Sequence, residues 1–156
     1  MGETVIRVSS LGKRIKGKTI LEDISFEINK GDCVALIGPN GAGKTVLMSC
    51  ILGDKKPSSG QVLIDGKVGK AKNKIAVLLQ ENTIPNSLKV EELIAFFQSI
   101  SDNPLTNQEV QDLLQFKEDQ YQQFADKLSG GQRRLLAFVL CLIDKPKILF
   151  LDEPTA

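Results

Sequence analysis

Histidine is absent from the 156-residue sequence, and only three cysteines are present. The absence of histidine excludes an imidazole as general base or metal ligand within this chain. Cys33, Cys50 and Cys141 match no metal-ligand spacing, and their odd number argues against a disulfide framework. Because all three lie in apolar segments, we expect buried free thiols in a reducing cytosol.

Long apolar runs and an imbalance of charge are also missing. The longest uninterrupted apolar run, Leu135–Ile143, is far shorter than the roughly 20 residues that a membrane-spanning helix requires. The first residues, Met1–Thr4, lack the basic and apolar regions of a signal peptide, so we expect a cytosolic protein. Twenty basic residues against 19 acidic ones give no case for a nucleic-acid surface. The 42% hydrophobic content suits one globular domain.

The first half of the chain reads mainly as strands. In the range 4–30, Ile24, Phe26 and Ile28 alternate with polar residues, which predicts antiparallel β structure. The range 33–37 is wholly apolar and predicts a strand covered on both faces, as does 75–79. A helix is expected over 45–52, and a strand over 61–64 followed by a turn at 65–66.

The second half becomes helical from about residue 85. Val90, Leu93, Ile94 and Phe97 share one helical face, and we expect Phe96 and Phe97 to belong to the core. A capping box at 106–109 begins another helix. A helix over about 130–143 and a strand over 148–151 complete the pattern.

A glycine-rich loop between the 33–37 run and the next helix fits the pattern G-x-x-x-x-G-K-[ST]. A chance match is on the order of one in a few hundred for a chain of this length. Glycines let the backbone wrap phosphates, and the following helix adds its positive N-terminal end. Lys44 can reach the β- and γ-phosphates, and the Thr45 hydroxyl can bind Mg²⁺. The candidate nucleotide-binding residues are Gly38, Pro39, Asn40, Gly41, Ala42, Gly43, Lys44, Thr45 and Val46.

Two carboxylates follow the apolar run 148–151. Asp152 is a candidate Mg²⁺ ligand, and Glu153 a candidate general base that polarises the attacking water. Taken alone, an acidic pair after a strand is more often part of a solvated loop. The phosphate loop in the same chain favours the catalytic interpretation.

The segment Leu128-Ser129-Gly130-Gly131-Gln132 decides the family. The phosphate loop, this segment and Leu-Asp-Glu-Pro-Thr-Ala at 151–156 follow in an order that resembles the nucleotide-binding domain of ATP-binding cassette (ABC) transporters. The resemblance runs over the whole chain, with Gln80 at the place of that family's Q-loop glutamine. Ser129 is a good helix N-cap, and two glycines leave backbone N–H groups bare for an anion.

The resemblance implies a role for each matching residue and two kinds of partner. Gln80 would touch Mg²⁺ or the attacking water, and Glu153 would be the catalytic carboxylate. The residues Ser129, Gly130, Gly131 and Gln132 would act in trans on ATP held by a second cassette, in a head-to-tail dimer. A transmembrane permease subunit would hold the protein at the cytoplasmic face of the membrane. The cofactors implied are ATP and Mg²⁺.

The fold implied is an α/β P-loop NTPase of the RecA/F1 type. An antiparallel β part would comprise 1–32 and 54–74, and a parallel-sheet core 33–53, 75–84 and 144–156. A helical insert with the signature segment would span 85–143. In the family a further strand, between the phosphate-loop strand and the Asp152 strand, and a histidine follow the last residues here, so we expect a truncated domain. The family's adenine-stacking aromatic is replaced by Ile15, which predicts weaker base recognition.

Alternatives to a transport ATPase remain open. One is a non-transport cassette of the repair or translation type, although the short segment between Gln80 and the signature argues against a long coiled-coil insertion. Another is an inactive fragment that at most binds nucleotide. Within transporters, Arg133-Arg134-Leu135 after the signature favours the bacterial export type. The transported substrate is not encoded here.

Overall fold

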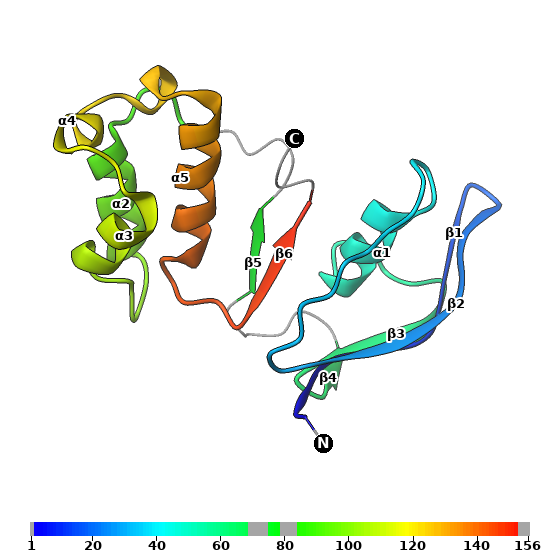
Figure 1. Cartoon of the computed structure of the whole chain (residues 1–156). Coiled ribbons are helices and arrows are strands. Elements are labelled where there is room, and N and C mark those ends of the chain that lie inside the picture. The colour runs from blue at the N-terminus through cyan, green and yellow to red at the C-terminus, as the bar shows by residue number, and fades with distance from the viewer. Residues whose placement is uncertain (1, 69–74, 79–83, 153–156) are drawn as a thin grey trace. The chain divides into compact units, whose positions relative to one another are not determined.

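The computed structural model describes residues 2–68, 75–78 and 84–152, and it has two compact units, Met1–Lys72 and Asn73–Ala156 (Figure 1). Among the described residues, the first unit combines one helix with a sheet, and the second combines several helices with a sheet. The first sheet is antiparallel and the second is parallel, which confirms an α/β fold with an antiparallel β part. The predicted division into three parts stays a prediction.

The first unit is built on a long antiparallel ribbon. Strands β1 (Thr4–Ile15) and β2 (Lys18–Asn29) are joined by Lys16 and Gly17, which both have positive φ angles, as a two-residue type I′ turn requires. Strands β3 (Ser59–Ile64) and β4 (Lys67–Val68) complete the sheet in the order β2-β1-β3-β4. The predicted antiparallel structure over 4–30 is therefore confirmed.

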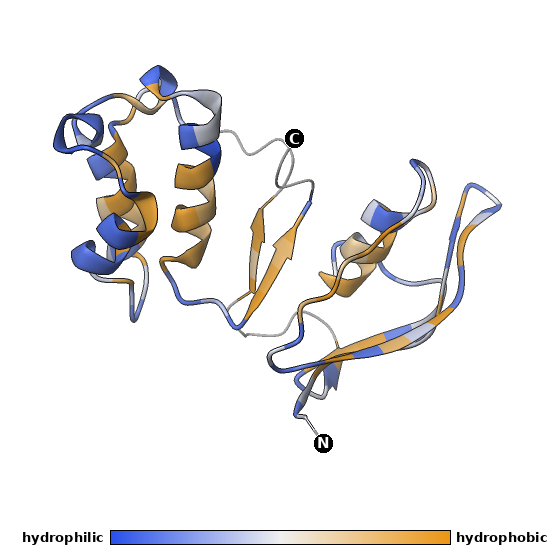
Figure 2. Cartoon of the chain, in the orientation of Figure 1, coloured by the Kyte–Doolittle hydropathy of each residue, from blue (hydrophilic) through white to orange (hydrophobic). Residues whose placement is uncertain are grey.

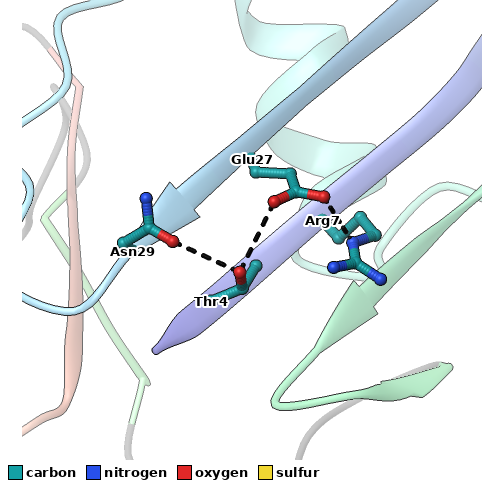
Figure 3. Close-up of polar contacts among 4 residues, drawn as sticks. All are labelled: Thr4, Arg7, Glu27 and Asn29. Carbon is teal, nitrogen blue, oxygen red and sulfur yellow. Dashed lines mark hydrogen bonds and ion pairs between the residues drawn. The ribbon is translucent and has the colours of Figure 1, made fainter. Parts of the chain in front are cut away.

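At one end of the ribbon, polar side chains join the two strands. Arg7 lies opposite Glu27 and its Nε donates to Oε1 at 2.7 Å (Figure 3). The Thr4 hydroxyl lies 3.2 Å from Oδ1 of Asn29. The first pair is exposed and the second is partly buried, and such pairs stabilise a sheet by about 1 kcal/mol at most. They mark the end of the ribbon opposite the turn at Lys16.

Helix α1 (Lys44–Ile51) supplies the other half of the first core. Its buried residues Leu47, Cys50 and Ile51 share one face, because three and four residues make about one helical turn. The helix ends before Gly53, whose φ of 77° suits a left-handed C-terminal cap. The core of this unit also includes Ile6, Val8, Leu11, Leu21, Val62 and Ile64.

The second unit packs helices on a short parallel sheet. Strands β5 (Ile75–Leu78) and β6 (Ile148–Leu151) pair in parallel, with Ile75 opposite Ile148 and Leu78 opposite Leu151. Helix α5 (Gly130–Leu142) contacts β5 as well as α2 (Val90–Ser99) and α3 (Asn107–Leu114). Figure 2 shows β5, β6 and most of α5 as apolar.

Smaller elements complete this unit. Helix α4 (Glu118–Tyr121) and a 3-10 turn (Ala125–Lys127) lead toward α5. The backbone bridge between Lys89 and Phe124 closes the segment on the start of α2. The core that they enclose is Leu78, Ile84, Val90, Leu93, Ile94, Val110, Leu114, Ala125, Leu128, Leu136, Ala137, Val139, Leu140 and Ile143. Among the residues described, no helix is long and apolar enough to span a membrane.

The predicted strand over 33–37 is wrong for this structure. These residues form no strand and are exposed, with Ile37 at 90% exposure. A fully apolar strand is stable only between two hydrogen-bonding neighbours, and no described strand pairs with this segment. Cys33 is exposed for the same reason, so the expectation of three buried thiols fails at this position.

The prediction that Phe96 belongs to the core is also wrong. It is 55% exposed, whereas Phe97 packs against the core. On α2, Phe96 lies about 100° away from the stripe formed by Val90, Leu93 and Ile94, since each residue advances the helix by that angle. The two rings meet edge to face, with centroids 5.7 Å apart. Phe96 therefore covers its neighbour rather than filling the core.

We predict that Gly60→Ala destabilises the protein by at least about 3 kcal/mol, because two separate costs combine. Gly60 has a φ of +72°, and an added Cβ would overlap the carbonyl oxygens of Ser9 and Ser10. Gly66 has the same φ, but nothing lies within 4 Å of its added Cβ. Gly66→Ala is the matched control and should cost only about 1–2 kcal/mol. Urea unfolding measures both, and equal losses would contradict a steric role for Gly60.

Candidate functional site

The predicted phosphate loop connects the exposed 33–37 segment to helix α1. Gly41 and Gly43 have φ angles of 81° and 94°, which non-glycine residues rarely adopt. The N–H of Ala42 donates to the carbonyl of Pro39 at 3.2 Å, so the loop closes on itself. The loop residues from Gly38 to Ala42 are exposed, so their backbone is accessible to a ligand.

Close packing fixes the end of this loop on the ribbon. A Cβ added at Gly43 would come within 3.0 Å of Leu21 Cδ2 and 3.2 Å of Ile20 Cγ2. Its φ and its contacts therefore both select glycine at this position. Leu21 is 6% exposed, so the junction between the loop and α1 rests on the buried face of β2.

The ammonium group of Lys44 lies inside the loop. Its Nζ donates to the carbonyl of Gly38 at 2.5 Å and to that of Pro39 at 2.9 Å. These two carbonyls belong to the residues that begin the phosphate motif. The side chain thus already bends back over the loop, where a bound phosphate would meet a positive charge.

The first turn of α1 has backbone donors that no side chain caps. Its N-cap is Gly43, no side chain accepts a hydrogen bond there, and the first turn contains no acidic residue. The first N–H groups of a helix lack partners within the helix. Thr45 is exposed beside them. Together with Lys44, this helix end can bind an anion.

The parallel sheet of the second unit positions the predicted metal ligand. The Asp152 N–H donates to the Leu78 carbonyl at 2.9 Å, which extends the ladder by one residue beyond β6. Arg134, from α5, places its Nη2 3.3 Å from the Asp152 carbonyl. The Cys141 thiol, also on α5, lies 3.7 Å from the Val77 carbonyl. Helix α5 therefore holds the sheet edge from which Asp152 projects.

Burial raises the pKa of the Cys141 thiol, and the charge of Arg134 partly offsets this effect. Burial likewise raises the pKa of Cys50 in α1. Both groups are therefore neutral thiols near neutral pH and act as apolar packing groups.

The N-terminus of α5 has the predicted capped geometry. The Ser129 hydroxyl accepts from the Gln132 N–H at 3.3 Å, and Gln132 Oε1 accepts from the Ser129 N–H at 3.0 Å. Gly130 and Gly131 are exposed, and nothing lies within 4 Å of a Cβ added to either. The Gln132 side chain, predicted to act on a second cassette, is used here within its own helix.

The predicted site residues are divided between the two units. The phosphate loop and Thr45 belong to the first unit, and Asp152 and the signature residues to the second. The predicted catalytic residues Gln80 and Glu153 lie outside the described residues. The strands that precede them, β5 and β6, are parallel and end side by side at Leu78 and Leu151.

The sequence did not predict the contacts of two residues that support the candidate site. Arg134 was considered only as part of the run after the signature, whereas its guanidinium contacts the backbone at Asp152. Lys13 Nζ donates to the Lys56 carbonyl at 2.6 Å and so joins β1 to the loop that follows α1. A basic residue has no sequence pattern that reveals a bond to a distant carbonyl, so neither contact could have been found.

Comparison with known proteins gives a consistent result. The family model described as "ABC transporter" matches residues 21–156. The spermidine/putrescine import ATP-binding protein PotA of Protochlamydia amoebophila is 35% identical over 94% of this chain and 41% of its own length. The phosphonates import ATP-binding protein PhnC of Wolinella succinogenes is 34% identical over 97% of this chain and 63% of its own. The chain thus spans about half the length of these relatives.

Solved structures share the fold. The structure of cbiO1 from Clostridium perfringens, described as part of the ABC transporter complex cbiONQ, superposes with a TM-score of 0.82. It is 27% identical, and the match covers 99% of this chain and 67% of that one. The P-loop NTPase fold predicted from the sequence is therefore confirmed.

We predict that Ser129→Ala and Thr106→Ala each lower the free energy of unfolding by about 1 kcal/mol. Thr106 caps α3 as Ser129 caps α5, and its hydroxyl accepts from the Glu109 N–H at 3.2 Å. Each substitution leaves one helix N–H without its acceptor. Thermal unfolding by circular dichroism measures both variants. No loss for Ser129→Ala would mean that its hydroxyl contributes nothing as a cap.

Proposed function

Because this chain belongs to the ABC transporter family, we propose that it binds Mg²⁺–ATP and hydrolyses it to drive transport through a separate membrane permease. The observation that carries this proposal is the uncapped start of α1 with Lys44 folded over the loop. A glycine loop, bare helix donors and one ammonium group are complementary to a polyphosphate. No side chain caps the start of α1, and its first turn holds no acidic residue.

The chain carries donor types that suit a magnesium ion, one in each unit. Thr45 and Asp152 offer a hydroxyl and a carboxylate, the hard oxygen donors that Mg²⁺ prefers. No cluster of three or more acidic, cysteine or histidine side chains is found among the described residues. None is needed, since Mg²⁺ in nucleotide sites takes most of its ligands from phosphates and water. When bound, the ion neutralises charge that develops on the phosphates.

The chain's own residues would divide the remaining work. The phosphate loop orients the γ-phosphate, and Lys44 stabilises its charge. Glu153 accepts a proton from the attacking water as a general base, and Gln80 orients that water. Arg134 supports Asp152 through its backbone, which is the kind of positioning that a metal ligand needs.

The exposed N-terminus of α5 supports a role in trans. Gly130 and Gly131, which follow Ser129 at the start of this 13-residue helix, leave backbone donors exposed. We propose that this end faces the γ-phosphate bound to a second cassette, in a head-to-tail pair. For Gln132 to contact that nucleotide, its Oε1 must first leave the Ser129 N–H.

The direction of transport and the location of the protein complete the proposal. The sequence predicted export, but the two relatives described above carry import in their names, and the prediction of export has no support from them. We therefore favour import. The chain would lie at the cytoplasmic face of the membrane, attached to the permease. Measuring the direction of substrate movement in vesicles that contain the chain and its permease tests this point.

We predict that Lys44→Ala and Glu153→Gln separate binding from turnover. Lys44→Ala removes the ammonium group of the loop and should weaken ATP binding at least about tenfold. Glu153→Gln removes the base and should lower turnover about a hundredfold or more while ATP binding stays intact. Calorimetric titration and phosphate release with Mg²⁺ measure the two properties. Tight binding without any Glu153-dependent turnover would indicate a protein that binds nucleotide but does not hydrolyse it.

The pair of cap variants also tests the signature segment. Ser129→Ala should lower ATP turnover at least about tenfold, because it alters a helix end that contacts phosphate in the transition state. Thr106→Ala, with the same loss of a capping hydroxyl, should leave turnover within about twofold. Equal turnover in the two variants would restrict Ser129 to a structural role.

A further inference from the structure

We propose that Arg133 is a positioning residue for ATP turnover, which acts through its hydrogen bond to Asn86 and fixes the direction of the exposed backbone donors at the start of α5. This inference rests on the proposed function, since a helix end needs no fixed direction unless it faces a phosphate. The residues 84–89, which lead into α2, form the entry segment that contains Asn86.

The hydrogen bond joins residues that lie 47 positions apart in the sequence. Arg133 Nη2 donates to Asn86 Oδ1 at 3.0 Å. Asn86 is exposed and Arg133 is partly buried. The entry segment leads into α2, which contacts α5 and lies beside it in Figure 1. The bond therefore adds a polar contact between two parts of the unit that already pack together.

The entry segment is held on both sides of Asn86. Before it, Ile84 is 7% exposed, and after it, Val90 is fully buried, so both side chains belong to the core of this unit. Between Asn86 and Val90, the Leu88 carbonyl accepts from the Ala125 N–H at 3.0 Å. A side chain that is bonded to Asn86 is therefore attached to the core of the unit.

Arg133 closes the first turn of α5, because its N–H donates to the Ser129 carbonyl at 2.8 Å. Gly130 and Gly131 lie within that turn, and nothing lies within 4 Å of a Cβ added to either. Neither glycine has a side chain that could hold the turn against its surroundings. The bond from Arg133 to the entry segment supplies this restraint from within one helical turn, about 5.4 Å along the axis.

The next residue restrains the helix in a second direction. Arg134 places its Nη2 3.3 Å from the Asp152 carbonyl, beyond the end of β6. Successive residues of a helix are about 100° apart around its axis, so the two arginines leave α5 on different sides. One contact alone would allow α5 to turn about its axis. The two contacts together, to the entry segment and to the end of β6, oppose this rotation.

Helix stability gives no reason for an arginine at position 133. The N-terminal end of a helix is positive, and the first turn of α5 contains no acidic residue. A cation so near that end is unfavourable for the helix by itself. The bond to Asn86 offsets part of this cost, and a positive charge here is compatible with a phosphate in front of the helix. The contact therefore suits a function of the helix end better than its stability.

Two interpretations of the bond differ in what they predict. As a surface contact, it contributes less than about tenfold to the unfolding equilibrium, and its loss leaves turnover unchanged. As a positioning contact, its loss misdirects donors that stabilise charge in the transition state, where small displacements are costly. The second interpretation predicts a loss in kcat that exceeds any loss in stability. It also predicts that removal of either partner gives the same result.

The variants are made in the protein assembled with its permease. Asn86→Ala removes the acceptor, and Arg133→Met removes the donor while most of the apolar stem stays. The double variant tests whether the two residues act through each other. Asn107→Ala is the matched control, because Asn107 Oδ1 accepts from Gln98 Nε2 at the same distance of 3.0 Å, between α2 and α3. That contact is also exposed and lies in the same unit.

Phosphate release is measured over a range of ATP concentrations, with thermal unfolding beside it. We expect Asn86→Ala and Arg133→Met each to lower kcat about fivefold, with the KM for ATP and the Tm nearly unchanged. The double variant should lose no more than the more affected single variant. Arg133→Lys keeps a cation and a donor and should retain at least half of the unsubstituted turnover. Asn107→Ala should stay within about 1.5-fold of the unsubstituted protein.

Other results would overturn the inference in distinguishable ways. Equal kcat values for Asn86→Ala and Asn107→Ala would reduce the bond to a surface contact. A loss for Arg133→Met that Asn86→Ala does not share would show that the charge of Arg133 acts without Asn86. A parallel fall in Tm and kcat would indicate a structural role. If the unsubstituted protein releases no phosphate and Lys44→Ala does not weaken ATP binding, the proposed function fails, and this inference fails with it.

Discussion

The contact between Gly43 and β2 is the constraint on which the phosphate loop depends. The loop must turn with a positive φ into α1 while its backbone lies against Leu21 and Ile20. A side chain at this position would strain the backbone and would force Leu21 and Ile20 to shift by a few tenths of an ångström. The strain would act next to Lys44, the first residue of the helix, whose ammonium group donates to the carbonyls of Gly38 and Pro39. The contact of Gly43 with β2 therefore fixes the start of α1 and, with it, the position of Lys44.

Much of the fold could be predicted because local patterns and tertiary packing agree. The sequence shows the alternating pattern of β2 around Phe26 and the apolar face of α2 around Leu93. It also shows the cap at Ser129, which marks the start of α5. The strand expected at 33–37 failed because hydrophobicity predicts burial but does not supply a hydrogen-bonding neighbour. The register of β5 against β6 could not be predicted from the sequence either, since it depends on pairs between distant residues such as Val77 and Phe150.

The sequence predicted the motifs of the candidate site but not the contacts that support them. Sequence motifs identified the phosphate loop and the capped helix, because each needs particular residue types at fixed spacing. The supports were not predictable, because Arg134 and Lys13 act through long side chains on backbone carbonyls.

The bonds of Lys44 stabilise the phosphate loop before any ligand is present. Before a phosphate binds, the ammonium group donates hydrogen bonds to two carbonyls of the loop itself. A phosphate must then exchange with those carbonyls, and only the difference between the two sets of bonds contributes to affinity.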